Sequence, residues 1–329
     1  AIPYFYWPGA RTVFGESLPT LWDRWRQEEL AYAQNVRETL VARGVTPSKP
    51  LTHHGRNITG SRYSPDGRFI IYSRTSPVDG STVRRIGRNG ENDRALVLET
   101  FSPRFSFTPD SAGFFFSQSA INERFNDFND LYRYDIESDD TTRLRDAHAQ
   151  DQSRRARDPD VSPDGKRLVF VQNRLHQTWV SIATFCGDQR ELLDVQILIP
   201  PSGDMQHASP RFSPDGHMIA VSTWFENGQR DIVMVDAQTG APIQRLTDDR
   251  ALDTNPAFSP DGHFLLYESD LDGISNLYAV DLKTLEHFRI TNVIGGAYQP
   301  EVSPEGLSLL FRNASGIGFD IHEMPFDPG

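Results

Sequence analysis

Short runs of apolar, β-branched and aromatic residues recur along most of the chain, and each follows a tight-turn sequence. The turn reads SPDG at four places, and TPDS and SPEG are near-copies. These six turns start at Ser64, Thr108, Ser162, Ser213, Ser259 and Ser303, with spacings of 44, 54, 51, 46 and 44 residues. A sequence that repeats at such a period is built from one supersecondary unit, used once per repeat.

The residues of each repeat predict four antiparallel strands. Pro presets φ at the first central turn position, Asp accepts a backbone N–H, and Gly supplies the positive φ. TPDS lacks this Gly, so Ser111 is expected under mild strain unless Gly113 takes the role. Alternating strands follow, such as 130–135 and 231–236, and each unit ends in a short strand such as 245–247. Four strands per 44–54 residues predict an all-β, six-bladed β-propeller with an N-terminal α-helix.

The sixth repeat contains only three of its four strands before Gly329. The segment KPLT precedes the first repeat and ends like the fourth strands of the others. We therefore predict that residues 48–52 supply the outer strand of the last blade, beside residues 319–324, and that 48–329 form one closed ring. Closure would remove the two exposed strand edges of an open ring.

Residues 1–47 do not repeat and form a separate N-terminal region. The first fifteen residues are aromatic and interrupted by Pro and Gly, which favours an extended packed segment. A single helix is predicted from the N-cap Ser17 to Gly44. Its apolar stripe, which includes Trp22 and Trp25, is expected to be buried against the propeller or another domain. The helix is acidic as well as basic on its polar side, which argues against a membrane-surface helix.

The amino-acid composition narrows the classes of partner that the protein is expected to bind. The net charge of −12 argues against nucleic acid and anionic membranes. The single Cys186 excludes an internal disulfide framework, and no apolar run reaches the roughly 20 residues of a membrane span. The chain starts at Ala1 rather than Met and has no visible signal peptide, which indicates a processed product or a fragment.

The repeated SPDG turn, followed by an apolar strand and by DIVMVD…RLT, resembles the TolB-like propeller repeats. The resemblance covers about residues 48–326. TolB-like propellers also occur beside the catalytic domains of prolyl-oligopeptidase-type and tricorn-type peptidases, and some are metal-dependent lyases of acidic sugars. The resemblance implies a propeller and a bacterial envelope location, periplasmic or extracellular, with the cytoplasm left open. It does not select one function, because one fold hosts many.

The stretch FGESLPTLWDRW resembles the end of the metallopeptidase-like domain that precedes TolB-like propellers in some large bacterial proteins. Those domains carry His-Glu-x-x-His, whereas the nearest string here, HEMPF at 322–326, has Phe326 in place of the second His and falls on a predicted strand. There is no Gly-x-Ser-x-Gly elbow and no glycine-rich phosphate loop. No complete catalytic motif is present, so we expect neither catalysis nor a cofactor.

The loops that join consecutive blades are the candidate binding surface, because function gathers on loops that a rigid scaffold holds. They lie on the face opposite the SPDG turns. Their candidate residues are His53, His54, His148, Arg154, Arg155, Arg157, His207, Asp253 and Tyr298. An insert on the same face, 120–130, carries Phe125 and Phe128, which suit a partner contact or packing on the second blade. The alternatives for this rim are a metal or anionic-ligand site and a solvated polar surface.

The acidic residues of the six turns also recur once per blade. They are Asp66, Asp110, Asp164, Asp215, Asp261 and Glu305. Local turn stabilisation is the preferred interpretation, and a shared cation is the alternative. Together these observations predict a non-catalytic scaffold that docks a protein partner or another part of its own longer polypeptide. The alternative function is an enzyme or an enzyme accessory domain: either a propeller attached to a peptidase, or a metal-dependent lyase that acts on acidic sugars at the channel mouth.

Overall fold

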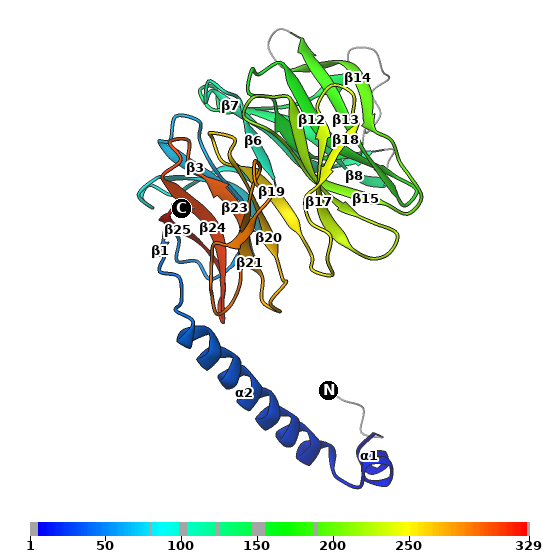
Figure 1. Cartoon of the computed structure of the whole chain (residues 1–329), viewed down its shortest axis with the longest axis vertical. Helices are drawn as coiled ribbons and strands as arrows, with labels where there is room; N and C mark the ends of the chain where they lie inside the picture. Colours follow the sequence, from blue (N-terminus) through cyan, green and yellow to red (C-terminus); the bar gives the residue numbers. More distant parts are fainter. Residues whose placement is uncertain are drawn as a thin grey trace. The chain divides into compact units, whose positions relative to one another are not determined.

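The computed structural model describes residues 6–78, 80–98, 104–122, 126–146, 155–186 and 190–327. The chain divides into two compact units, Ala1–Thr46 and Pro47–Gly329. In the second unit, the described strands form six antiparallel sheets of four strands each, one per repeat, and one of the sheets has an additional edge strand (Figure 1). The six-bladed propeller is therefore confirmed.

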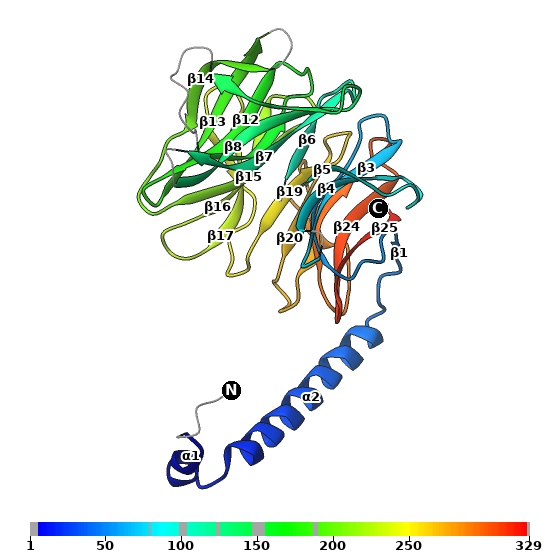
Figure 2. The same ribbon diagram turned by 180° about the vertical axis from the view of Figure 1, so that it is seen from behind.

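The first three blades follow the chain in order. Blade 1 consists of β2 (Asn57–Tyr63), β3 (Phe69–Ser76), β4 (Gly80–Gly87) and β5 (Arg94–Leu98). Blade 2 consists of β6 (Phe105–Phe107), β7 (Gly113–Asn122), β8 (Asn126–Asp135) and β9 (Asp140–Arg143). Blade 3 consists of β11 (Ala156–Val161), β12 (Arg167–Arg174), β13 (Gln177–Cys186) and β14 (Glu191–Ile199). The additional strand, β10 (Arg145–Asp146), pairs in parallel with β14, so this segment joins blade 3 instead of extending blade 2. Figure 2 shows β12, β13 and β14 of this blade side by side in green.

The last three blades complete the ring. Blade 4 consists of β15 (Gln206–Phe212), β16 (Met218–Trp224), β17 (Arg230–Asp236) and β18 (Pro242–Arg245). Blade 5 consists of β19 (Thr254–Phe258), β20 (Phe264–Ser269), β21 (Asn276–Asp281) and β22 (His287–Arg289). Blade 6 consists of β23 (Ala297–Val302), β24 (Ser308–Ser315), β25 (Gly318–Pro325) and β1 (Lys49–Pro50). The innermost strands contact one another in the order β2, β6, β11, β15, β19, β23 and back to β2.

The hydrophobic core lies between neighbouring blades. Phe115 of blade 2 packs in one buried cluster with Phe170 of blade 3, and Leu310 of blade 6 packs in another with Ile58 of blade 1. Side chains on the two faces of each strand alternate, so one blade supplies apolar residues to both of its neighbours. This arrangement makes the ring itself the unit that buries apolar surface.

Blade 6 is completed by the segment that precedes blade 1. Lys49 pairs with Glu323, Pro50 pairs with His322, and the Leu51 N–H donates to the Ile321 carbonyl at 2.7 Å. Figure 1 shows β1 in blue beside β25 in red, from opposite ends of the propeller sequence. The carboxylate of Asp320 also accepts hydrogen bonds from the Thr52 hydroxyl at 2.8 Å, the His54 N–H at 2.7 Å and the Gly55 N–H at 3.1 Å.

The repeated turns share one hydrogen-bond pattern. In blade 4 the Ser213 hydroxyl donates to Asp215 at 2.5 Å, and Asp215 accepts the His217 N–H at 3.0 Å. The hydrogen bond from Ser213 lowers the pKa of Asp215. Ser111 takes φ = 59°, so it bears the left-handed conformation that Gly holds elsewhere. Glu305 departs from the pattern, because it forms an ion pair with Arg88 of blade 1. Local bonding thus accounts for the five aspartates of the turns, whereas Glu305 links blade 6 to blade 1.

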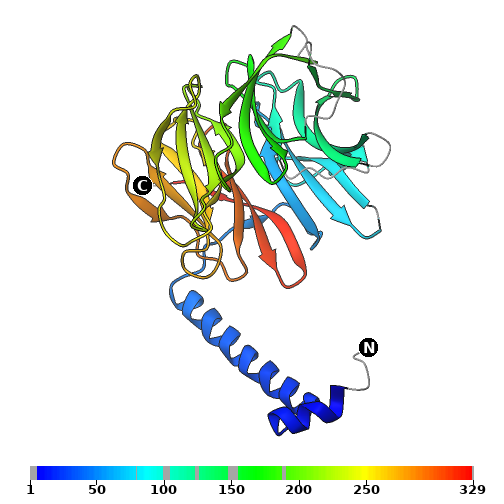
Figure 3. The same cartoon turned by 90° about the vertical axis from the view of Figure 1, so that its right-hand side faces the viewer.

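The N-terminal unit contains two described helices, α1 (Tyr6–Phe14) and α2 (Leu18–Ala42), drawn in dark blue in Figure 3. Helix α1 lies where we expected an extended segment. Ser17 caps α2 by accepting the Thr20 N–H, and Gly44 ends it with φ = 86°. Neither described helix has the length and apolar character required to cross a bilayer.

The N-terminal unit by itself does not bury Trp22 and Trp25, so their burial against the propeller or another domain stays a prediction. These side chains are 61% and 49% exposed, and their rings lie 4.8 Å apart, centroid to centroid. An apolar stripe at helical spacing predicts that one face of a helix packs against another surface, but the stripe does not identify that surface. The two indoles contact each other instead of a core.

Candidate functional site

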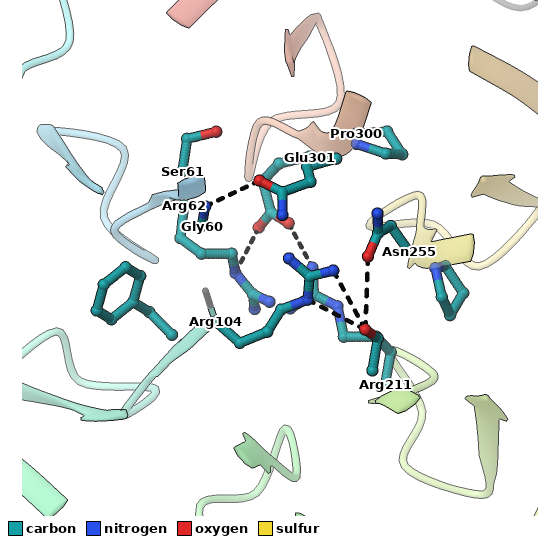
Figure 4. A pocket seen from close by; sticks show the side chains of 12 residues that line it. Gly60, Ser61, Arg62, Arg104, Arg211, Asn255, Pro300 and Glu301 are labelled. Carbon is teal, nitrogen blue, oxygen red and sulfur yellow. Dashed lines mark hydrogen bonds and ion pairs between the residues drawn. The ribbon is translucent and has the colours of Figure 1, made fainter. Parts of the chain in front are cut away.

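The channel of the propeller is lined by the innermost strand of each blade. The residue two positions before each turn serine faces the channel, and in four blades it is charged: Arg62, Asp160, Arg211 and Glu301. These four residues form a closed ring of ion pairs, which we call the channel quartet. Figure 4 shows Arg62 and Arg211 directed at Glu301. Blades 1, 3, 4 and 6 are therefore connected through the centre of the molecule.

Each guanidinium group of the channel quartet bridges both carboxylates. Arg62 lies 2.9 Å from Glu301 and 3.6 Å from Asp160, measured nitrogen to oxygen. Arg211 lies 2.6 Å from Glu301 and 3.5 Å from Asp160. Asp160 also accepts the Phe212 N–H at 2.9 Å and the Ser106 hydroxyl at 3.1 Å. The four charges compensate one another in a site where an isolated charge would be costly.

Burial shifts the acids of the quartet. The Glu301 side chain is 14% exposed, and burial raises its pKa to about 7 against the opposing effect of Arg62 and Arg104. Burial likewise raises the pKa of Asp160 to about 6, although Arg62 opposes it. Near neutral pH, Glu301 thus exchanges a proton readily, and the charge of the quartet varies with pH.

The quartet separates two cavities. On the side of the blade-joining loops lies a space of about 20 Å³, which suits a single water molecule, lined in part by Arg104, Ser209 and Asn255. On the side of the turns lies a cavity of about 330 Å³, which we call the turn-side bowl. Arg62, Arg211 and Glu301 line both spaces, so the quartet is the partition between them.

Arginines gather on the other side of the partition, around the mouth formed by the blade-joining loops. We call Arg104, Arg157, Arg230 and Arg312 the mouth arginines. The nearby carboxylates are Asp158, Glu268 and Glu301, and Glu301 already pairs with Arg62 and Arg211 in the channel quartet, so the mouth arginines outnumber the carboxylates near them. Burial lowers the pKa of Arg104, Arg230 and Arg312. A positive surplus inside a chain of net charge −12 favours an anionic ligand.

The mouth arginines are held in place by neighbouring groups. Arg104 donates to the Ser209 hydroxyl at 3.2 Å from both Nε and Nη2, so it crosses from blade 2 to blade 4. Arg312 lies over the rings of Tyr298 and Phe319, 4.8 and 4.2 Å from their centroids. Such packing fixes a guanidinium group without neutralising it.

The predicted histidines that the structure describes, His53, His54 and His207, have different surroundings. His54 bonds the Tyr72 hydroxyl at 3.0 Å and lies 3.3 Å from Asp93 at the edge of blade 1, whereas His53 is exposed. His207 is buried, with Nδ1 3.1 Å from the Thr223 hydroxyl. Burial and the charge of Arg157 lower the pKa of His207 to about 4, so it is neutral at pH 7. No group of three His, Cys, Asp or Glu side chains among the described residues has the arrangement of a metal site.

The remaining predicted residues have separate surroundings. Arg155 lies over the ring of Phe128, 3.7 Å from its centroid, so the arginine segment contacts the insert at 120–130. Asp253 is 1% exposed, and burial raises its pKa to about 6. Tyr298 belongs to the mouth through Arg312. His148, Arg154 and Phe125 lie outside the described residues.

The channel quartet and three of the mouth arginines, Arg104, Arg230 and Arg312, were missed by the sequence reasoning. The signal was present in the repeats, because aligning the six turns places Arg62, Ser106, Asp160, Arg211, Ala257 and Glu301 in one column. A second column, two positions earlier, contains Gly60, Arg104, Asp158, Ser209, Asn255 and Gln299. Its members in blades 1, 3, 4, 5 and 6 have positive φ at a register shift of the innermost strand. A bulge of this kind redirects side chains, here toward the channel.

A closed ring of six four-stranded antiparallel blades defines a β-propeller. The sequence profile of the TolB beta propeller domain matches residues 126–328, which is more than half of the chain. The chain therefore belongs to the TolB β-propeller domain family.

Solved structures agree on the fold. TolB from Acinetobacter baumannii is 16% identical with a TM-score of 0.57, and the match covers 83% of this chain and 64% of that one. An oligogalacturonate lyase in complex with manganese is 12% identical with a TM-score of 0.55, covering 85% and 93%. A puromycin hydrolase is 14% identical with a TM-score of 0.60, covering 85% and 55%. This chain thus spans less than two thirds of that TolB and of the hydrolase, and the likeness extends to the fold alone.

Proposed function

We propose that the propeller is a non-catalytic docking scaffold whose blade-joining face receives an acidic segment of a protein partner, or of its own longer polypeptide. The observation that carries the proposal is the surplus of mouth arginines over carboxylates. Two of them, Arg230 and Arg312, form hydrogen bonds to neutral oxygen atoms, and neither forms an ion pair of 4.0 Å or less within the described part of the chain. Carboxylates of a partner would supply the missing countercharge.

Arg155 extends this positive surface outward. It is stacked on Phe128, so an aromatic side chain and a guanidinium group are presented together. Aromatic residues and arginine are the residue types enriched at protein interfaces. A positive patch on an acidic protein also steers an acidic partner toward one face. The family supports a bacterial envelope location, periplasmic or extracellular, as part of this proposal.

The test uses a fluorescein-labelled decaglutamate peptide and fluorescence anisotropy at several salt concentrations. We expect binding that weakens as salt rises, because exposed charges are screened over about 10 Å at 0.1 M salt. The double variant Arg104→Gln/Arg312→Gln should bind at least about tenfold more weakly. Thermal unfolding of the variant checks that the ring remains folded.

The matched control changes two basic residues beside the turns, in the variant Arg68→Glu/Lys166→Glu. Arg68 is exposed and its ion pair with Asp66 is local, so this change leaves the mouth intact. We expect the control to bind decaglutamate as the parent protein does. The proposal is rejected if the control loses binding while the mouth variant keeps it, or if the parent protein does not bind decaglutamate at low salt.

A further inference from the structure

The turn-side bowl is built from equivalent positions of the six repeats. Its rim is made by the turn prolines, which are Pro65, Pro109, Pro163, Pro214, Pro260 and Pro304. Its wall is made by the residue before each turn serine, which is Tyr63, Phe107, Val161, Phe212, Phe258 or Val302. Its floor is the channel quartet. The cavity of about 330 Å³ lies within the size range of small-molecule sites.

The wall and rim select an apolar body. Every wall residue is aromatic or aliphatic, and the prolines lack backbone N–H donors. A ligand that covers the wall removes apolar surface from water, which contributes about 25 cal/mol for each Å² buried. A strongly hydrated ligand would gain nothing from this surface. The bowl therefore suits a hydrocarbon or aromatic group.

The floor selects the head group. Arg62 and Arg211 both line the bowl, so two guanidinium groups stand at its floor beside Glu301 and Asp160. A carboxylate is the acceptor that matches a guanidinium group best. A cation would face Arg62 and Arg211, and a polyanion would face both Glu301 and Asp160.

We propose that the turn-side bowl binds an apolar monocarboxylate, an aromatic or medium-chain acid, with its carboxylate at Arg62 and Arg211 and its hydrocarbon against the wall. This site lies across the channel quartet from the mouth, and its ligand is a small molecule. The inference therefore goes beyond the docking function proposed above and does not depend on it.

The quartet adds a pH dependence with a definite sign. Glu301 faces Arg62 on β2, Arg211 on β15 and Asp160 on β11, with Arg104 nearby. A bound carboxylate disfavours the charged forms of Glu301 and Asp160, so binding is accompanied by proton uptake. Affinity should then rise as the pH falls from about 8 to about 6, by at most about tenfold per pH unit for each proton taken up. The ligand remains ionised over this range, because carboxylic acids titrate near pH 4.

The experiment compares phenylbutyrate with phenylbutanol, which has the same hydrocarbon body but no carboxylate. Binding is measured by saturation-transfer NMR and isothermal titration calorimetry. We expect the acid to bind at millimolar concentration or below, and the alcohol at least about tenfold more weakly. Equal binding of the two compounds, or no binding of the acid at millimolar concentration, would overturn the proposal.

Two variants locate the site. Val302→Phe narrows the bowl with a residue type that blades 2, 4 and 5 already carry at this position, and it should lower the affinity for phenylbutyrate at least about tenfold. Val302 also packs in a buried cluster of blades 5 and 6, so thermal unfolding checks that the variant remains folded. Val78→Phe, at a residue that is 84% exposed and absent from the bowl, is the control and should change nothing. Arg62→Gln should remove the preference for the acid over the alcohol. Unchanged binding by Val302→Phe would place the ligand elsewhere and refute the assignment, even if Arg62→Gln fails to fold.

Discussion

Asp320 is the residue through which the closing segment is most directly held, and its replacement tests how the ring is closed. Its carboxylate accepts three hydrogen bonds from residues 52–55. A typical intramolecular hydrogen bond contributes about 0.5–1.5 kcal/mol net, and bonds to a charged group contribute more. We therefore expect Asp320→Ala to lower the free energy of unfolding by about 2–4 kcal/mol. For a protein of this size, that corresponds to a drop of about 5–10 °C in the melting temperature.

The assay is urea denaturation of the whole chain, followed by circular dichroism, together with the rate of unfolding. Asp236→Ala is the matched control, because Asp236 also accepts three hydrogen bonds, from Gln238 and Thr239. These bonds span at most three residues, whereas those of Asp320 span more than 260. We expect a clearly smaller effect for the control. If Asp236→Ala destabilises the protein as much as Asp320→Ala, the long-range hydrogen bonds of Asp320 have no special role in closing the ring, and the reasoning fails.

A double-mutant cycle with Thr52→Val measures the coupling free energy between Thr52 and Asp320 directly. Thr52 donates to Asp320 and accepts the Ile321 N–H at 2.9 Å, so the two side chains belong to one network. Residues in one network are expected to show a coupling free energy of at least about 0.5 kcal/mol. Additive effects of Thr52→Val and Asp320→Ala would contradict the network.

Two further predictions concern the channel and the core. Because the pKa of Glu301 is raised to about 7, the folded state binds more protons than the unfolded state above about pH 4.5, and the free energy of unfolding should fall as the pH rises from there to 7. Glu301→Gln should flatten this decline, measured by urea denaturation at a series of pH values. An unchanged pH dependence in the variant would contradict the assignment. Phe114→Ala should cost about 3–5 kcal/mol, since Phe114 is fully buried in blade 2, whereas Trp22→Ala should stay within about 0.5 kcal/mol. Strong quenching of Trp22 fluorescence by iodide would agree with its exposure, and a large loss of stability in Trp22→Ala would not.

The parts of the fold that follow from local chemistry could be predicted from the sequence. The turn at Ser213 needs only Pro, Asp and Gly at fixed offsets, and the strands beside it need only alternating apolar and polar residues. The local sequence of each repeat therefore suffices to predict its turn and strands. The identity of the outer strand of blade 6 follows from counting strands in the repeats. Helix α2 and its cap at Ser17 are likewise local.

The candidate site depends on distances that no local pattern contains. Arg62 and Glu301 are 239 positions apart, and they meet only because the ring places blade 6 beside blade 1. The sequence places His54 and His207 in blade-joining loops on the same face of the propeller. In the structure, His54 forms a hydrogen bond with Tyr72 in blade 1, whereas His207 is buried in blade 4. The surface that would cover Trp22 is likewise not specified locally, because an apolar stripe predicts that a covering surface is needed but not which one it is.

The channel quartet also bears on how six similar repeats are kept in order. Repeats of one chain can exchange with those of another, and tandem repeats are prone to such misassembly. The quartet gives blades 1, 3, 4 and 6 different charges at one equivalent position. A ring with a blade omitted, or borrowed from a second molecule in another position, would leave buried charges without partners or bring like charges together. Because blades 1 and 4 supply the positive charges and blades 3 and 6 the negative ones, the four residues disfavour any assembly that breaks this alternation.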